Sequence, residues 1–238
     1  MKSTPENKIA VVTGGSGAIG SAIVAGLEKQ GVCAVSLDMA RPAAAPFQAC
    51  DVRDGGSVAA AIAKVQDTYG RLDLVVHAAG VSREAVVWKL AVEDWDFVQS
   101  VNLRGAFLLL RHAIPVMRAG EGGRIVLIGS INGSRGKFGT SAYSASKAGL
   151  IALARTVARE VARLKSLVNV VEPGWVRTPL TDSLPQAVRD AALAESLVGR
   201  YVEPADVAAA VTFLCGPGAQ QITGQILRVD GGQSLGSV

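Results

Sequence analysis

The chain has 238 residues, of which 49% are hydrophobic and 18% charged, and its formal net charge is +4. This length and apolar content suffice for one sizeable core, so we expect a single domain over residues 1–238. The mild positive charge is scattered without a basic run, which argues against nucleic-acid binding. No apolar run approaches the ~20 residues needed to cross a bilayer, and the amino terminus lacks the apolar core of a signal peptide. We therefore expect a cytoplasmic protein with no membrane partner.

Three cysteines, Cys33, Cys50 and Cys215, lie in apolar segments. A small, odd number of cysteines in such surroundings favours buried reduced thiols over disulfides or a metal centre. We therefore expect no metal site.

The predicted elements begin with a strand over residues 8–13, a short β-branched apolar run typical of a buried parallel strand. A glycine-dense turn follows, then a helix from residue 19 that ends by Gly31, and a second strand over 32–37 that reaches Asp38. Strand, glycine-rich turn, helix, strand and acidic residue form the pattern of a dinucleotide-binding unit.

The alternation of strands and helices continues to the end of the chain. Further strands are predicted over residues 48–51, 73–78, 124–130, 167–171 and 226–229, and helices over 57–69, 93–117, 143–163 and 204–214. This repetition predicts an α/β fold, a single-domain Rossmann-type doubly wound parallel sheet of about seven strands with helices on both faces. The connection over about 175–203 is unusually long, and it forms either a substrate lid or a packed peripheral helix pair.

Tyr143 and Lys147 lie four residues apart in one predicted helix, so their side chains share a face. A lysine cation beside a tyrosine favours the phenolate and lowers the pKa of the phenol, which creates a proton-transfer group. The spacing alone is more often that of an ordinary surface helix. Its interpretation therefore depends on the rest of the chain.

The glycine-rich turn has the sequence Thr13-Gly14-Gly15-Ser16-Gly17-Ala18-Ile19-Gly20. Its glycines let the backbone approach a pyrophosphate, whose charge is met by the amino end of the next helix. Asp38, eighteen residues past Gly20, would accept hydrogen bonds from both hydroxyls of an adenosine ribose and repel a 2′-phosphate. This favours NAD over NADP, although Arg41 is close enough in sequence to meet a phosphate if it is not simply a solvated charge.

Together these motifs resemble the short-chain dehydrogenase/reductase family, from about residue 8 to residue 232. The matching motifs are Thr13-Gly14 with Ile19-Gly20, Asp51-Val52, His77-Ala78-Ala79-Gly80, Asn102, Ser130, Tyr143 with Lys147, and Pro173-Gly174 with Thr178. Ala18 stands where the family has glycine, and His77 where it has asparagine. Residues 83–95, 129–139 and 222–232 are most similar to the 3-oxoacyl-thioester reductases of the family.

The resemblance implies four catalytic residues. Tyr143 would be the acid in ketone reduction and the base in alcohol oxidation, and Ser130 would hydrogen-bond the substrate oxygen. Lys147 would lower the pKa of Tyr143 and hold the nicotinamide ribose. Asn102 would distort its helix and support a water chain that carries protons from Lys147 to solvent.

The resemblance also implies how a nicotinamide cofactor is held. Asp51 would bind the adenine amino group, Ala78 and Gly80 would lie along the adenosine half, and Val176 and Thr178 would hold the carboxamide and a phosphate. The complete implied set is Gly14, Ser16, Ile19, Gly20, Asp38, Asp51, Val52, Ala78, Gly80, Tyr143, Lys147, Val176 and Thr178.

The sequence thus predicts an NAD(H)-dependent oxidoreductase that interconverts a secondary alcohol and a ketone. The substrate is a 3-hydroxyacyl or 3-oxoacyl thioester or a cyclic or aryl alcohol, because the reductase-like segments and the expected use of NAD favour different directions of reaction. Three cations in the specificity loops either bind an anionic part of a thioester carrier or are solvated: Arg135, Lys137 and Arg177.

The family resemblance further implies a homotetramer built through the two long helices. Small residues on the outer helix face would allow close packing: Ala142, Ala145, Ala148 and Ala152. The alternative function is a non-catalytic dinucleotide sensor or scaffold on the same fold. The presence of Ser130, Tyr143 and Lys147 argues against that alternative.

Overall fold

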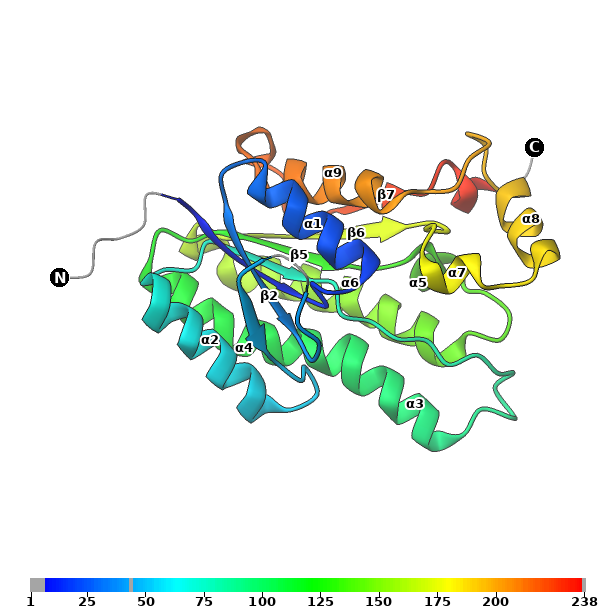
Figure 1. The fold of residues 1–238 in the computed structure, drawn as a ribbon, viewed down its shortest axis with the longest axis horizontal. Helices are drawn as coiled ribbons and strands as arrows, with labels where there is room; N and C mark the ends of the chain where they lie inside the picture. Colours follow the sequence, from blue (N-terminus) through cyan, green and yellow to red (C-terminus); the bar gives the residue numbers. More distant parts are fainter. Residues whose placement is uncertain (1–6, 43–44, 237–238) are drawn as a thin grey trace.

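Seven strands form one sheet in the order β3-β2-β1-β4-β5-β6-β7, and every pairing is parallel (Figure 1). The strands are β1 (Ile9–Thr13), β2 (Cys33–Asp38), β3 (Phe47–Ala49), β4 (Leu74–His77), β5 (Arg124–Ile128), β6 (Leu167–Pro173) and β7 (Ile226–Val229). The predicted doubly wound α/β fold is confirmed. The chain reverses direction across the sheet between β1 and β4, where open parallel sheets bind their ligands.

This structure is a computed structural model that describes residues 7–42 and 45–236. The other positions lie outside the described residues, including residues 1–6, on which the expectation about a signal peptide rests. Within the described ranges, no helix is long and apolar enough to cross a membrane. The same part of the chain holds no group of His, Cys, Asp or Glu side chains that could bind a metal ion. The three cysteines are free thiols, and Cys50 and Cys215 are buried while Cys33 is half-buried.

Both faces of the sheet are covered, which explains why its strands are continuously apolar. In β1, Ile9 and Val11 point into one core cluster while Ala10 and Val12 point into the other. Helices α1 (Ala18–Glu28) and α9 (Pro204–Cys215) cover the second cluster, at the top of Figure 1. On the opposite face lie α2 (Gly55–Tyr69), α4 (Gly105–Ala119) and α6 (Ser141–Val161).

The helix predicted over residues 93–117 is interrupted. It consists of α3 (Val92–Gln99), a π-helical stretch, η1 (Ser100–Arg104), and α4. Asn102 lies in the middle of η1, so the distortion expected at this residue is observed. Single π turns inside α-helices often occur at functional sites.

Three short helices lie in segments expected to be irregular or only weakly helical: α5 (Ile131–Arg135), α7 (Pro179–Asp182) and α8 (Gln186–Ala194). The Ser130 side chain caps α5 by accepting a hydrogen bond from the backbone N–H of Asn132 at 3.2 Å. Thr178 and Thr181 form a reciprocal capping box on α7. The two ends of the segment 175–203 are joined by backbone pairing between Val176 and Val202. This segment is therefore anchored at its base.

Candidate active site

Four predicted catalytic side chains meet at the carboxyl edge of the sheet, beside the point where the strand order reverses. Ser130 follows β5, Asn102 lies in η1, and Tyr143 and Lys147 occupy the first turns of α6. Ser130, Asn102 and Lys147 are buried and Tyr143 is half-buried. The site is thus built from three different elements held by one rigid sheet.

Lys147 is fixed at the end of β5. Its Nζ donates a hydrogen bond of 2.7 Å to the carbonyl oxygen of Ile128 and lies 5.6 Å from the centre of the Tyr143 ring. The Ser130 hydroxyl lies close enough to the Tyr143 phenol to lower its pKa. The phenol, the serine hydroxyl and the ammonium therefore converge, as a group that protonates a carbonyl oxygen requires.

The sequence predicts a lowered pKa for Tyr143, and the structure shows the opposite direction. Burial raises the pKa of Tyr143 above its usual value, and the charge of Glu84 raises it further, whereas the hydrogen bond with Ser130 lowers it. The net pKa of Tyr143 is therefore raised, not lowered as its spacing from Lys147 predicts, because desolvation of the phenolate outweighs the favourable contact with Ser130. Burial lowers the pKa of Lys147 itself to about 8. At neutral pH the site therefore holds a protonated phenol, the state that ketone reduction needs.

Asn102 has its side chain fully engaged. Its Oδ1 accepts a hydrogen bond of 2.8 Å from the N–H of Val81, and its Nδ2 donates to Val81 O at 2.9 Å and to Ser146 Oγ at 3.0 Å. Gly80 lies close by: a Cβ on this residue would be 3.4 Å from Lys147 Nζ and 3.6 Å from Asn102 Oδ1. Gly80, expected along the adenosine half of the cofactor, thus borders the catalytic side chains.

His77, to which the sequence assigned no chemistry, lies directly beneath this site. Its ring is fully buried, with Nδ1 2.9 Å from Thr13 Oγ1 and Nε2 3.1 Å from the carbonyl oxygen of Asn102. Burial and the nearby charge of Lys147 lower the pKa of His77 to about 3, so the ring is neutral. Two sequence signals point to His77: it is a polar residue at the end of an apolar strand, and it stands where the family has asparagine.

The glycine-rich turn has the geometry expected of a phosphate cradle. Gly14 has φ 67°, and a Cβ there would lie 2.7 Å from the Ala79 backbone, so only glycine fits. Gly20 packs equally closely against the carbonyl of Gly14. Gly17 is the N-cap of α1, which begins at Ala18. The methyl group of Ala18, where the family has glycine, therefore does not prevent the helix amino terminus from facing the turn.

Asp38 lies beside the glycine-rich turn at the end of β2. One carboxylate oxygen accepts a hydrogen bond of 3.0 Å from the N–H of Ser16, and the other accepts one of 2.7 Å from the N–H of Met39. Arg41, the residue that left NADP open, stacks its guanidinium 5.3 Å from the centre of the Phe47 ring. The negative charge at the end of β2 is thus held in place by the turn itself.

The remaining predicted cofactor residues follow the carboxyl ends of other strands. Asp51 is paired with Arg53 at 2.7 Å, which lowers the pKa of the carboxyl, and Val52 packs under Gly105. Ala78 donates a backbone hydrogen bond of 3.1 Å to Thr13 O. Because parallel strands end at the same edge of a sheet, these residues share that edge with Val176 and Thr178 after β6 and with Ile19 in α1.

The three cations considered as anion ligands all have partners. Arg135 forms an ion pair of 2.8 Å with Glu195, and Arg177 one of 3.6 Å with Asp182. Lys137 lies 5.2 Å from the centre of the Trp175 ring. The Arg135 pair joins α5 to the end of α8, so this residue fastens the segment 175–203 to the body of the protein.

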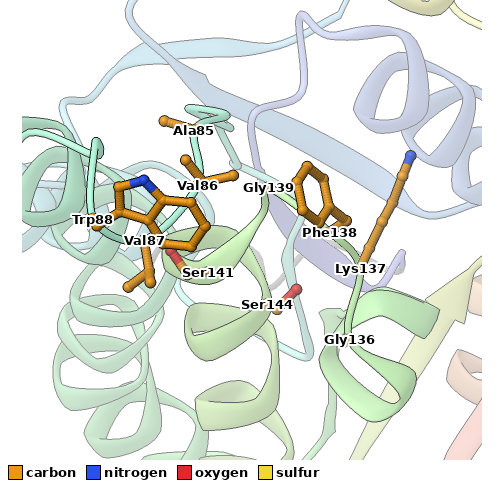
Figure 2. Close-up of a pocket in the computed structure, with 10 residues that line it drawn as sticks. All are labelled: Ala85, Val86, Val87, Trp88, Gly136, Lys137, Phe138, Gly139, Ser141 and Ser144. Carbon is orange, nitrogen blue, oxygen red and sulfur yellow. The ribbon is translucent and has the colours of Figure 1, made fainter.

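A groove of about 350 Å³ opens beside the first turn of α6 (Figure 2). Its lining residues are Ala85, Val86, Val87, Trp88, Gly136, Lys137, Phe138, Gly139, Ser141 and Ser144. Trp88 and Phe138 lie on either side of it and are 77% and 85% exposed. Such large exposed apolar side chains around a cavity indicate a surface that another apolar group covers.

Comparisons with known proteins point to one family of oxidoreductases. The family model described as enoyl-(acyl carrier protein) reductase matches residues 16–234. The 3-oxoacyl-(acyl-carrier-protein) reductase FabG of Thermotoga maritima is 33% identical, over 95% of this chain and 98% of that protein. The acetoacetyl-CoA reductase of Synechocystis is 37% identical, over 95% and 96%.

Solved structures give the same result for the fold. The ligand-free aldohexose dehydrogenase of Thermoplasma acidophilum has a TM-score of 0.90 and 30% identity, with 96% of this chain and 94% of that chain covered. The relatives named above are oxidoreductases, and their similarity extends over nearly the whole chain. This chain is therefore an oxidoreductase that belongs to the short-chain dehydrogenase/reductase family.

Proposed function

We propose that this enzyme uses NAD(H) to interconvert 3-oxoacyl and 3-hydroxyacyl thioesters. The observation that carries the proposal is the convergence of Ser130, Tyr143 and Lys147 at the sheet edge that also holds the glycine-rich turn. The names of the relatives favour a thioester over a cyclic or aryl alcohol. The same convergence favours an enzyme over a dinucleotide sensor, because a sensor needs no acid beside a substrate oxygen.

The side chains have complementary roles in reduction. A nicotinamide cofactor, when bound, would supply the hydride for the carbonyl carbon. Tyr143 gives its O–H proton to the carbonyl oxygen, while Ser130 donates a hydrogen bond to that oxygen as negative charge develops on it. The Lys147 ammonium then restores the proton to the phenolate and can hold the nicotinamide ribose hydroxyls. Asn102, fixed against Val81 and Ser146, keeps the π turn beside Lys147 in place for proton exchange with solvent.

The choice of NAD rests on Asp38. Its carboxylate is held by Ser16 N at the rim of the turn, where an adenosine ribose would lie, and a 2′-phosphate there would meet a fixed negative charge. Gly14 and Gly20 let the turn pack closely against Ala79 and on itself, and the amino end of α1 that follows would meet the charge of the pyrophosphate. Asp51 and Val52 would meet the adenine, and Val176 and Thr178 the nicotinamide end.

We infer that residues 175–203 form the substrate lid of a single domain and that the groove between Trp88 and Phe138 receives the apolar acyl portion. The lid is supported by the Val176–Val202 pairing and by the ion pair from Arg135 to Glu195. Ser141 and Ser144, in the first turn of α6, line the groove, so a bound acyl chain would extend from the region of Tyr143 into it.

A homotetramer in the cytoplasm remains part of the proposal. Ala145, Ala148 and Ala152 are exposed on α6, and Phe107 on α4 is 47% exposed. Ala142 was expected on the same outer face, but it is fully buried inside the protomer, because α3 packs against this turn. Sedimentation velocity should give one species of four chains.

The pH dependence of reduction follows from the pKa of Lys147, about 8 in this structure. The ammonium is present below that pH and is lost above it, whereas Tyr143 keeps its proton because its pKa is raised. We therefore expect kcat/KM for ketone reduction to fall as pH rises through about 8. The Lys147→Arg variant carries a guanidinium that stays charged, so its remaining kcat/KM should not fall as pH rises through about 8. A wild-type profile flat to pH 10 would contradict the assignment.

The experiment that tests the function crosses NADH and NADPH with acetoacetyl-CoA, a cyclic ketone and crotonyl-CoA. We expect the highest kcat/KM for NADH with acetoacetyl-CoA. Crotonyl-CoA tests reduction of a carbon–carbon double bond, the reaction named in the description of the matching family. Binding of NADH without turnover of any substrate would favour the sensor instead.

A further inference from the structure

His77 is the last residue of β4, and its fully buried ring touches two elements of the proposed site. Nδ1 lies 2.9 Å from the hydroxyl of Thr13, which immediately precedes the glycine-rich turn. Nε2 lies 3.1 Å from the carbonyl oxygen of Asn102 in the π-helical stretch η1. One side chain therefore links the end of β1 to the distorted turn that carries Asn102.

The partners determine which nitrogen of His77 carries the proton. A carbonyl oxygen can only accept, so Nε2 must carry the hydrogen and donate it to Asn102 O. Nδ1 then has a lone pair and accepts from the Thr13 hydroxyl, whose oxygen remains free to accept from Ala79 N at 3.4 Å. A single neutral tautomer satisfies all of these groups. If Nδ1 were also protonated, it could no longer accept from the Thr13 hydroxyl, and the hydrogen of that hydroxyl would lose its acceptor.

We propose that His77 is a positioning residue that, as the Nε2–H tautomer, holds the Asn102 carbonyl and thereby keeps the Asn102 amide on Val81 and Ser146 beside Lys147. Both of its ring nitrogens are occupied, so it does not exchange protons with the substrate. Its neutrality agrees with the pKa of about 3 that burial imposes. The proposal depends on the proposed function only for its effect on turnover.

The effect of His77 should be local to Asn102. The glycine-rich turn has its own backbone hydrogen bonds, from Gly14 N to Leu37 O at 2.9 Å and from Gly17 N to Gly14 O at 3.0 Å. Loss of the His77 ring therefore leaves the cofactor cradle formed. The Asn102 carbonyl, in contrast, loses a buried hydrogen-bond donor. The nearest reporter is the N–H of Val81, which donates to Asn102 Oδ1.

The test compares the wild type with His77→Phe, which removes both contacts, and His77→Gln, whose amide N–H can take the place of Nε2–H. The chain has two histidines, so His112→Gln on α4 is a matched control. Imidazole ¹⁵N spectra report the tautomer of His77. Amide hydrogen exchange at Val81 reports whether its N–H stays hydrogen-bonded to Asn102 Oδ1. If the Phe variant does not fold, the smaller His77→Leu gives the same comparison.

We expect His77 to remain the Nε2–H tautomer from pH 5 to 8. Val81 exchange should be about tenfold faster in His77→Phe, and close to wild type in His77→Gln and His112→Gln. In the Phe variant kcat should fall about tenfold while the Kd for NADH stays within about twofold, and the Gln variant should restore kcat.

An Nδ1–H tautomer, titration of His77 in this pH range, or equal Val81 exchange in wild type and His77→Phe would overturn the proposal. So would a Gln variant that behaves like the Phe variant. The spectra and exchange rates require no turnover. An inactive wild type would therefore count against the proposed function, while these two measurements would still decide the role of His77.

Discussion

Replacement of Tyr143 by phenylalanine is expected to lower kcat by about 10²–10⁴-fold, the range typical for loss of a positioned acid. The substitution removes one oxygen and leaves the ring, so α6 and its packing should persist. Lys147 is held by Ile128 O as well as by its position beside the ring, so its place does not depend on the phenol oxygen. The Kd for NADH should therefore stay within about threefold of wild type. Stopped-flow single turnovers and fluorescence titration measure the two quantities.

Tyr69→Phe is the matched control, because Tyr69 is half-buried near the end of α2 and lies outside the site. Its kcat should equal that of wild type. If Tyr143→Phe kept most of its activity, another group would have to protonate the substrate. Ser130, the side chain that interacts with Tyr143, would then be the next residue to substitute.

Replacement of Asp38 by asparagine should have the second-largest effect, on the choice of cofactor. At about 4 Å in water, one pair of like charges costs about 1 kcal/mol, and a 2′-phosphate carries nearly two charges. The repulsion alone is therefore worth about 30-fold in relative affinity. Hydrogen bonds from the ribose hydroxyls to the carboxylate add to the preference. We expect wild type to favour NADH over NADPH by about 100-fold or more, and Asp38→Asn to remove most of that preference.

Asparagine is the informative replacement because its side-chain oxygen can still accept from Ser16 N, as the Asp38 carboxylate does at 3.0 Å. The turn should therefore keep its shape while the charge is lost. Asp67→Asn, on the exposed side of α2, is the control for a general change in charge. The ratio of kcat/KM for the two cofactors is the measured quantity. An unchanged ratio in Asp38→Asn would show that this carboxylate does not select the cofactor.

The fold could be predicted from the sequence because it depends on local patterns. Continuous apolar runs such as Ile9–Thr13 have one plausible place, a strand covered on both faces. Parallel strands then bring their carboxyl ends to one edge of the sheet, and the resemblance to the family is what names Ser130, Tyr143 and Lys147 as the side chains to expect there. Even the distortion at Asn102 was anticipated, although the sequence did not give its π-helical form.

The remaining features depend on contacts between distant residues. The rise in the pKa of Tyr143 comes from burial, which a four-residue spacing to Lys147 cannot reveal. The pairing of Arg135 with Glu195 joins residues 60 apart in the chain. His77 acquires its partners only when β1, β4 and η1 meet. Ala142 is buried rather than outward because Gln99 of α3 reaches its carbonyl at 2.9 Å.

The most direct test of the proposed reaction follows the hydride itself. Wild-type enzyme is incubated with acetoacetyl-CoA and NADH that carries deuterium at both positions of the nicotinamide C4, and the product is analysed by mass spectrometry and NMR. The proposed mechanism predicts 3-hydroxybutyryl-CoA with a single deuterium on C3, formed at wild-type rate by Tyr69→Phe and about 10²–10⁴-fold more slowly by Tyr143→Phe. A product without deuterium at C3, or equal rates for the two variants, would contradict hydride transfer at a site in which Tyr143 is the acid.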